Sequence, residues 1–251
     1  MHLKGIYAPI VTPFNADESI NYPVLEQLIE YLIANKIAGL VPGGTTGEVY
    51  AFTEAERLDI FKFTKEKVNG RVTLIAGTNS GATRDVVRYS QIAEGMGYDA
   101  LMVAVPPYSR PNQRELLAHY EAVAKAVKIP IVLYNFPWRA GTEVSYEVMD
   151  GLTKYNHVIG IKEASGDFQQ CMTIIKNKPE DFLVISGDDI ITLPLMVLGA
   201  DGVISVVANA FPDDFSQMVR HAANGNFSEA AELHYKLLEI MINLFVEGNP
   251  A

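Results

Sequence analysis

The chain has 251 residues, 49% of them hydrophobic, which is enough to bury one large core. Its formal charge of −10, with 30 acidic against 20 basic residues and no basic run, disfavours nucleic acid and anionic membranes as partners. The single cysteine, Cys171, excludes an internal disulfide and favours a reducing compartment. No apolar run is long enough for a membrane span or, near Met1, for a signal peptide, so we expect a soluble, cytoplasmic protein.

Short apolar runs recur along the chain, each followed by a longer segment with apolar residues three or four positions apart. The runs are typical of buried strands, and the segments are typical of amphipathic helices. This alternation fits a closed (β/α)8 TIM barrel or an open doubly wound sheet, and the count of eight favours the barrel. The expected strands are 5–10, 39–41, 72–76, 100–105, 131–134, 158–161, 182–185 and 202–206.

A ninth helical pattern, from Phe227 to Phe245, follows the eighth βα unit. We therefore expect the barrel to occupy residues 1–225 and a C-terminal helical segment to occupy residues 226–251. Local signals agree with the helix assignments, since Thr53 followed by Glu56 forms the pattern of a capping box.

The sixth expected strand delivers a lysine, Lys162, to its carboxyl end, which is where the chemistry of a barrel gathers. The apolar run 158–161 precedes it, and Ala164–Asp167 turns the chain after it. Burial disfavours an ammonium ion, so a lysine in this place can lose its proton near neutral pH and form a Schiff base with a carbonyl. The alternative is a structural lysine whose ammonium group reaches water along a buried stem.

Polar side chains at other expected strand ends favour the chemical role. A Schiff-base enzyme acting on a 2-oxo acid needs an amine, a proton shuttle and donors for the carboxylate. Each candidate taken singly is more often an ordinary wall or loop residue, but together they supply all three functions. The candidates are Lys162 as the amine, Tyr134 as the proton shuttle, Thr45 and Thr46 in a glycine-rich carboxylate cradle, and Arg139 for a second anionic group.

Other chemistries fit less well. The five histidines show no metal-ligand spacing, and no phosphate-binding or nucleophile-elbow motif occurs. Asp188 and Asp189 could bind a cation, but a pair directly before a helical pattern is more often a helix cap. Two carboxylates after the seventh strand also argue against a phosphorylated ligand.

Three segments at the expected strand ends contain most of these candidates: Gly44-Thr45-Thr46-Gly47-Glu48, Tyr134-Asn135-Phe136-Pro137 with Arg139, and Gly160-Ile161-Lys162-Glu163-Ala164-Ser165-Gly166-Asp167. In order and spacing they closely resemble the dihydrodipicolinate synthase and N-acetylneuraminate lyase family of class I aldolases. The likeness runs from about Gly5 to Pro250, and the segments Ser186–Asp189 and Gly202–Ser205 support it.

The resemblance implies a (β/α)8 barrel that joins or cleaves pyruvate units through a lysine imine, with no metal and no other cofactor. Its partners would be small molecules, pyruvate and an aldehyde, and not nucleic acid or membrane. Family members are usually homotetramers of two tight dimers. Because their chains continue beyond the point at which this sequence ends, at Ala251, we expect a C-terminal extension that is cut short, and a homodimer becomes a stronger candidate beside the homotetramer.

The resemblance also implies roles for individual residues. Lys162 would form the imine with pyruvate, and Tyr134 would transfer protons. Thr46 and Tyr108 would complete a hydroxyl relay with Tyr134, with Tyr108 reaching in from a neighbouring subunit. Thr45 and nearby backbone would hold the pyruvate carboxylate. The remaining substrate pocket residues would be Ile204 and Gly187.

The acceptor is less constrained. Paired threonines, Tyr108 and Arg139 look like the synthases of the family, in which the arginine binds the carboxylate of L-aspartate 4-semialdehyde. Trp138 beside the arginine and Ala140, where a threonine commonly stands, leave open a 2-keto-3-deoxy sugar acid aldolase or dehydratase, or an N-acetylneuraminate lyase. A barrel that binds a keto acid without turnover is a third class, but it would have no need for the amine.

Some synthases of the family bind lysine as an inhibitor in a cavity at the dimer interface. This chain lacks the usual polar set there, so we predict weak or no inhibition by lysine. The residues that it offers instead are Val49, Tyr50, Glu54, Arg57, Gly81 and Pro107.

Overall fold

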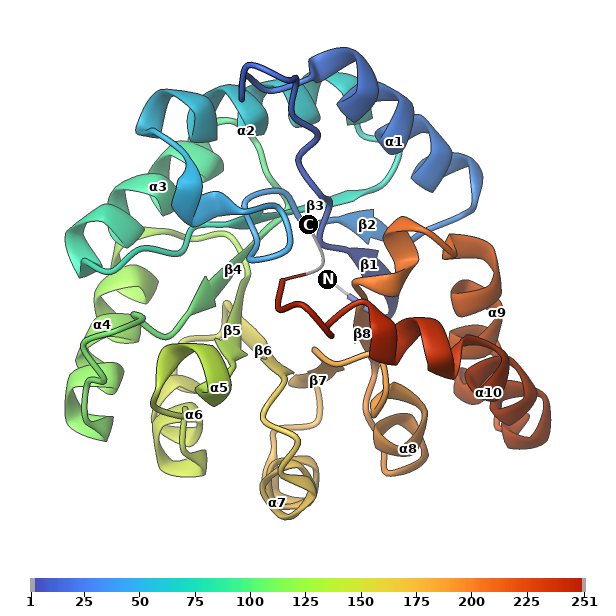
Figure 1. Ribbon diagram of the computed structural model, residues 1–251. Coiled ribbons are helices and arrows are strands. Elements are labelled where there is room, and N and C mark those ends of the chain that lie inside the picture. Colours follow the sequence, from blue (N-terminus) through green and yellow to red (C-terminus); the bar gives the residue numbers. More distant parts are fainter. Residues whose placement is uncertain (1–2, 250–251) are drawn as a thin grey trace.

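Eight parallel strands close into a barrel in the order β1 to β8, as the count of apolar runs predicts. The computed structural model describes residues 3–249, and Figure 1 looks onto the ring of strands with the helices around it. The fold is therefore the expected (β/α)8 barrel. The strands are β1 Gly5–Ala8, β2 Gly39–Leu40, β3 Thr73–Gly77, β4 Ala100–Ala104, β5 Ile131–Asn135, β6 Val158–Glu163, β7 Leu183–Ser186 and β8 Gly202–Ile204.

Helices follow each strand and cover the outside of the barrel (Figure 1). The predicted capping box at Thr53 is confirmed, because its hydroxyl accepts from the backbone of Glu56 and the Glu56 carboxylate accepts from the backbone of Thr53. The helices are α1 Tyr22–Ala34, α2 Glu54–Val68, α3 Thr83–Gly95, α4 Gln113–Ala126, α5 Pro137–Ala140, α6 Tyr146–Leu152, α7 Phe168–Asn177, α8 Thr192–Val197, α9 Pro212–Ala223 and α10 Phe227–Asn243, with 3-10 turns η1 Val49–Ala51 and η2 Val207–Asn209.

Two apolar cores result from the alternation of side chains along the strands. An inner cluster fills the barrel and includes Tyr7, Met102, Tyr134 and Ile204. A larger outer cluster lies between the strands and the helices, and it includes the only cysteine, Cys171. Successive residues at a strand end therefore face different surroundings, one inside the barrel and the next outside it.

Strand β6 extends two residues further than the apolar run suggested. Lys162 lies within the strand, where it is paired with Tyr134 of β5 and with Ile185 of β7. The added pairs satisfy the backbone of the lysine on both sides. The side chain is thus held by a sheet and not by a loop.

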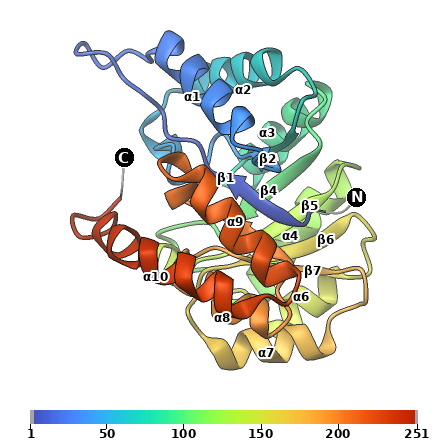
Figure 2. The same ribbon diagram turned by 90° about the vertical axis from the view of Figure 1, so that its right-hand side faces the viewer.

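Helix α10 packs against α9 and ends at Asn243, two residues before the predicted end (Figure 2). After it the chain crosses towards the mouth of the barrel, where the Asn249 side chain donates to the Thr45 carbonyl over 3.4 Å. The predicted division at residue 225 remains a prediction, and residues 250–251 of the predicted segment lie outside the described residues.

Candidate active site

Lys162 lies at the floor of the barrel mouth with only 4% of its surface exposed. Its Nζ atom is 4.0 Å from the centre of the Tyr134 ring. Burial lowers the pKa of Lys162 from 10.5 to about 7, and the negative charge of Asp189 opposes part of this shift. In a large fraction of the molecules Lys162 is therefore a neutral amine at physiological pH, and the neutral amine is the nucleophilic form.

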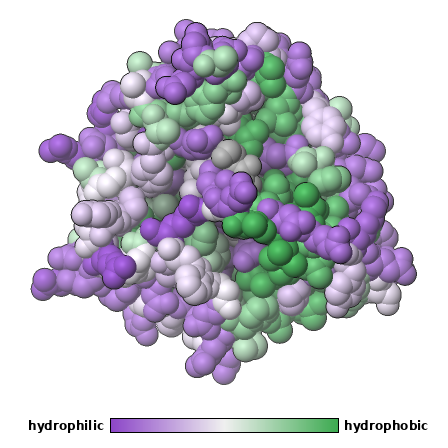
Figure 3. All heavy atoms as spheres, viewed as in Figure 1, coloured by the Kyte–Doolittle hydropathy of each residue, from purple (hydrophilic) through white to green (hydrophobic). Residues whose placement is uncertain are grey.

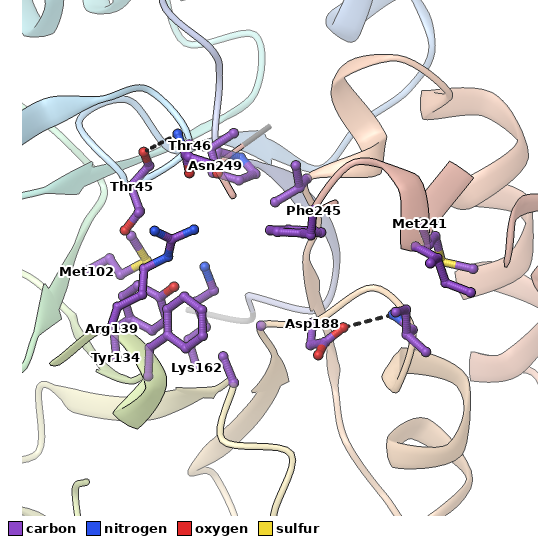
Figure 4. Close-up of a pocket in the computed structure, with 17 residues that line it drawn as sticks. Thr45, Thr46, Met102, Tyr134, Arg139, Lys162, Asp188, Met241, Phe245 and Asn249 are labelled. Carbon is purple, nitrogen blue, oxygen red and sulfur yellow. Dashed lines mark hydrogen bonds between the residues drawn. The ribbon is translucent and has the colours of Figure 1, made fainter. Parts of the chain in front are cut away.

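A cavity of about 250 Å³ opens above the lysine. In Figure 4 the Lys162 amine and the Arg139 guanidinium point into it, with Thr45 and Thr46 on one side and Asp188 and Phe245 on the other. The predicted residues that line it are Thr45, Thr46, Tyr134, Arg139, Lys162 and Gly187.

Tyr134 is also buried, and this burial raises the pKa of its phenol. Hydrogen bonding with the Thr45 side chain and the charge of Arg139 act in the opposite direction. The hydroxyl that lowers the pKa of Tyr134 thus belongs to Thr45, whereas the resemblance implied Thr46 as the relay hydroxyl. The two threonines are adjacent in one loop, and sequence position alone does not say which of them turns towards the phenol.

Gly187 leaves the space that the lysine occupies. A Cβ atom built on it would lie 2.9 Å from the Cε atom of Lys162 and 2.8 Å from the Cβ atom of Ala164. Both distances are shorter than real Cβ contacts. The requirement for glycine here is steric, because any side chain would displace the amine.

Arg139 lies on the short helix α5, with its guanidinium carbon 5.6 Å from the centre of the Phe136 ring. It lines the lysine cavity and also a neighbouring cavity that contains Trp138, Tyr50 and Pro107. The arginine therefore stands at the boundary of two hollows, where it could bind an anionic group that enters from either.

Two predicted residues lie away from the cavity. Tyr108 is 97% exposed and has a positive φ of 72°, and it is not among the residues that line the cavity of its own chain. Its expected action in a neighbouring subunit stays a prediction. Ile204 is buried in the inner cluster with Tyr134, and Val206 lines the cavity in its place.

The prediction that Asp188 and Asp189 cap the following helix is wrong. Helix α8 begins only at Thr192 and has no side-chain cap. Asp189 is buried and accepts from the backbone N–H of Val207 at 2.8 Å, while Asp188 accepts from that of Ile190 at 3.0 Å. Burial raises the pKa of Asp189 to about 6.

Residues from the C-terminal part of the chain also line the cavity, and sequence reasoning did not find them. They come from the end of α10 and from the segment after it, far from the strand ends along the chain, and nothing local in their pattern marks them as site residues. They are Met241, Ile242, Phe245 and Asn249.

None of the helices within residues 3–249 combines the length and the apolar character that a membrane span needs. Across the same range, no three His, Cys, Asp or Glu side chains converge in an arrangement that could hold a metal ion.

Known proteins resemble this chain over its whole length. A sequence profile of the dihydrodipicolinate synthetase family matches residues 2–251. The 4-hydroxy-tetrahydrodipicolinate synthase of Phocaeicola vulgatus is 45% identical over 250 residues, which are 99% of this chain and 84% of the relative.

Solved structures agree with the sequence match. The 4-hydroxy-tetrahydrodipicolinate synthase of Methylacidiphilum fumariolicum SolV superimposes with a TM-score of 0.96 at 36% identity, covering 99% of this chain and 83% of that one. The chloride-inhibited dihydrodipicolinate synthase of Acinetobacter baumannii, complexed with pyruvate, gives a TM-score of 0.96 at 35% identity, covering 99% and 85%.

A closed (β/α)8 barrel with a buried, partly neutral lysine at its mouth has the architecture of a class I, imine-forming lyase. The match over the whole sequence makes the assignment specific. The chain belongs to the dihydrodipicolinate synthetase family.

Proposed function

We propose that this chain is a 4-hydroxy-tetrahydrodipicolinate synthase, which condenses pyruvate with L-aspartate 4-semialdehyde through an imine on Lys162. The observation that carries the proposal is the lysine itself, buried in the cavity 4.0 Å from the Tyr134 ring with a pKa of about 7. The names of the relatives support the choice of reaction, and one solved relative is complexed with pyruvate.

In the proposed reaction the neutral Lys162 amine attacks the C2 carbonyl of pyruvate and forms a carbinolamine. A proton delivered by Tyr134 lets the former carbonyl oxygen leave as water, which gives an iminium ion. This ion draws electrons from the methyl group, which loses a proton to give an enamine. The enamine carbon then attacks the aldehyde carbon of the acceptor, whose oxygen takes up a proton, and the iminium on Lys162 forms again. The acceptor's own amine adds to the iminium carbon and closes a ring, and breakage of the bond to the Lys162 nitrogen releases the cyclic product and the free lysine. No added cofactor is required, because the iminium nitrogen serves as the electron sink.

Tyr134 is the proposed proton carrier in these steps. Its phenol lies beside the amine, and its raised pKa keeps it protonated, as a general acid must be. We assign the relay hydroxyl next to Tyr134 to Thr45, because hydrogen bonding with its side chain lowers the pKa of the phenol. Thr46 and the loop backbone would then bind the pyruvate carboxylate. Tyr108 of a second copy would extend the relay.

Arg139 is the proposed contact for the acceptor's carboxylate. Its guanidinium points into the cavity above the lysine, and Thr45 and Thr46 line the same cavity (Figure 4). An acceptor with a carboxylate at the far end, such as aspartate semialdehyde, suits this arrangement.

We also propose a homo-oligomer acting on small molecules. Apolar side chains gather beside the barrel mouth over α8 and α10, as the space-filling view shows (Figure 3). On these two helices, Val197 of α8 is 53% exposed and Ile242 of α10 is 49% exposed. Contact with a second copy would remove such groups from water.

The test is borohydride reduction in the presence of pyruvate, followed by peptide mass mapping. We expect one adduct, on Lys162, in the wild type and none in Lys162→Met, with Lys62→Met on the exposed face of α2 as a control that still forms it. No adduct in folded wild-type protein would overturn the proposal.

The acceptor is tested separately. Purified protein should consume aspartate semialdehyde in a pyruvate-dependent manner and should not cleave 2-keto-3-deoxy sugar acids or N-acetylneuraminate. Cleavage of one of these sugar acids without consumption of aspartate semialdehyde would leave the imine mechanism in place and assign a different substrate.

A further inference from the structure

The residues that follow Tyr134 and Lys162 form a pair of their own on the outer side of the barrel wall. Asn135 and Glu163 are aligned across β5 and β6, directly after the aligned pair Tyr134 and Lys162. Because side chains alternate along a strand, the first pair faces the cavity and the second faces the helices. Neither residue of the outer pair lines the cavity.

The outer pair is joined by hydrogen bonds. The Asn135 amide donates to both carboxylate oxygens of Glu163, over 3.2 Å and 2.9 Å. The side-chain oxygen of Asn135, Oδ1, accepts from the backbone N–H of Val144 at 2.9 Å. The Glu163 carboxylate accepts from the backbone N–H of Ser165 at 2.7 Å. Gln170 of α7 adds a longer contact of 3.4 Å to Glu163.

Both side chains are completely buried, with no exposed surface. A buried carboxylate is costly unless its oxygens are well bonded, so its partners hold it in one geometry. The bonds tie the loop after β5 and the loop after β6 to the two strands. These two loops follow directly on the strand ends that carry Tyr134, the proposed acid, and Lys162, the proposed amine.

We propose that Asn135 and Glu163 are positioning residues, which lock the ends of β5 and β6 together and so hold Tyr134 and Lys162 at reacting distance. The inference rests on the proposed imine chemistry. The pair touches no substrate and acts through the register of two neighbouring strands.

The chain offers a charge-conserving test. Asn135→Asp alone sets two carboxylates against each other, and Glu163→Gln alone sets two amide N–H2 groups against each other or deprives Ser165 of its acceptor. In the double variant the new carboxylate at 135 accepts from Val144 and from the new amide at 163, whose oxygen still accepts from Ser165. Size and net charge are unchanged, so no cavity is created.

The readout is the rate at which borohydride traps the pyruvate adduct, together with kcat and the KM for pyruvate. We expect each single variant to lose about 10- to 100-fold in trapping rate and kcat, since a small misplacement of reacting groups has effects of this size. The KM should change less, because the carboxylate cradle lies on a different loop. The double variant should recover to within about fivefold of wild type.

Tyr98→Phe is the matched control. Its hydroxyl is buried and donates to the Phe61 carbonyl at 2.9 Å, away from the cavity. It should lower the melting temperature while leaving the trapping rate unchanged. A general loss of stability would affect this control and the pair alike.

Single variants with wild-type rates would overturn the positioning role, and so would a double variant no faster than the product of the two single effects. If a single variant does not fold, Asn135→Ala replaces it. A wild-type trapping rate in Asn135→Ala would also overturn the positioning role. Failure of the wild type to trap pyruvate would instead remove the proposed function, and this inference with it.

Discussion

Replacing Lys162 with methionine should abolish the reaction and make the protein more stable. Methionine has a similar length but no charge, so it occupies the same buried space without the cost of desolvating an ammonium ion. The pKa of Lys162 is about 7 in the fold, against an ordinary value of 10.5. The unfolded chain therefore binds more protons than the folded one between these two pH values.

This difference in pKa gives the sign and size of the penalty, which is the free energy of unfolding that the fold loses by burying the charged lysine. The penalty is complete below pH 7, declines as the pH rises, and disappears above 10.5, where the lysine is neutral in both states. With about 1.4 kcal/mol for each pKa unit, it amounts to about 4 kcal/mol at pH 7 and about 2 kcal/mol at pH 9. Lys162→Met should thus raise the melting temperature at pH 7 by roughly 10 °C.

The assay is chemical denaturation of wild type, Lys162→Met and Lys62→Met at pH 7 and pH 9, at one protein concentration so that association is held constant. The advantage of Lys162→Met over wild type should be about 2 kcal/mol smaller at pH 9 than at pH 7. Lys62 lies exposed on α2, so Lys62→Met removes one positive charge without changing a buried site and serves as the matched control. A gain for Lys162→Met that is equal at both pH values would refute a lowered pKa for the lysine.

The rate of pyruvate trapping should rise with pH, reach half its maximum near pH 7 and level off above it, because the neutral amine of Lys162 is the nucleophile; a rate that keeps rising tenfold per pH unit to pH 10 would indicate an ordinary lysine. Gly187→Ala should lower the trapping rate about 100-fold in folded protein, because its methyl group would displace the lysine stem; near-normal rates with a normal circular dichroism spectrum would contradict this. Millimolar lysine should leave turnover unchanged. Arg57 is one of the residues that this chain offers where other synthases bind lysine. Its buried guanidinium donates to the Asn79 and Val49 carbonyls and would repel a second cation; dose-dependent inhibition in a steady-state assay would contradict this prediction.

The sequence by itself determined the succession of elements. Buried parallel strands are nearly continuous apolar runs, and helices that cover a barrel have one apolar face, so both patterns are local and readable. Eight such units are confirmed as β1 to β8. The same local logic picked out Lys162 and Tyr134, because each is a reactive side chain at the carboxyl end of an apolar run.

Only the tertiary structure decided what surrounds those side chains. The pKa of Lys162 depends on how completely the barrel buries it, and the division of work between Thr45 and Thr46 depends on which hydroxyl turns to the phenol. Asp189 resembled a helix cap in sequence, yet its carboxylate bonds the backbone of Val207, 18 residues away. Such partners cannot be read from a window of neighbouring residues.

The pairing of Asn135 with Glu163 shows the physical reason most clearly. Each is the polar residue after a reactive one, but whether they meet depends on the register of β5 against β6. Register is set by the packing of the whole barrel, and a slip of one strand by one residue would turn its side chain to the other face and separate the pair. The local pattern therefore identified the reactive residues, while closure of the barrel determined the groups that hold them in place.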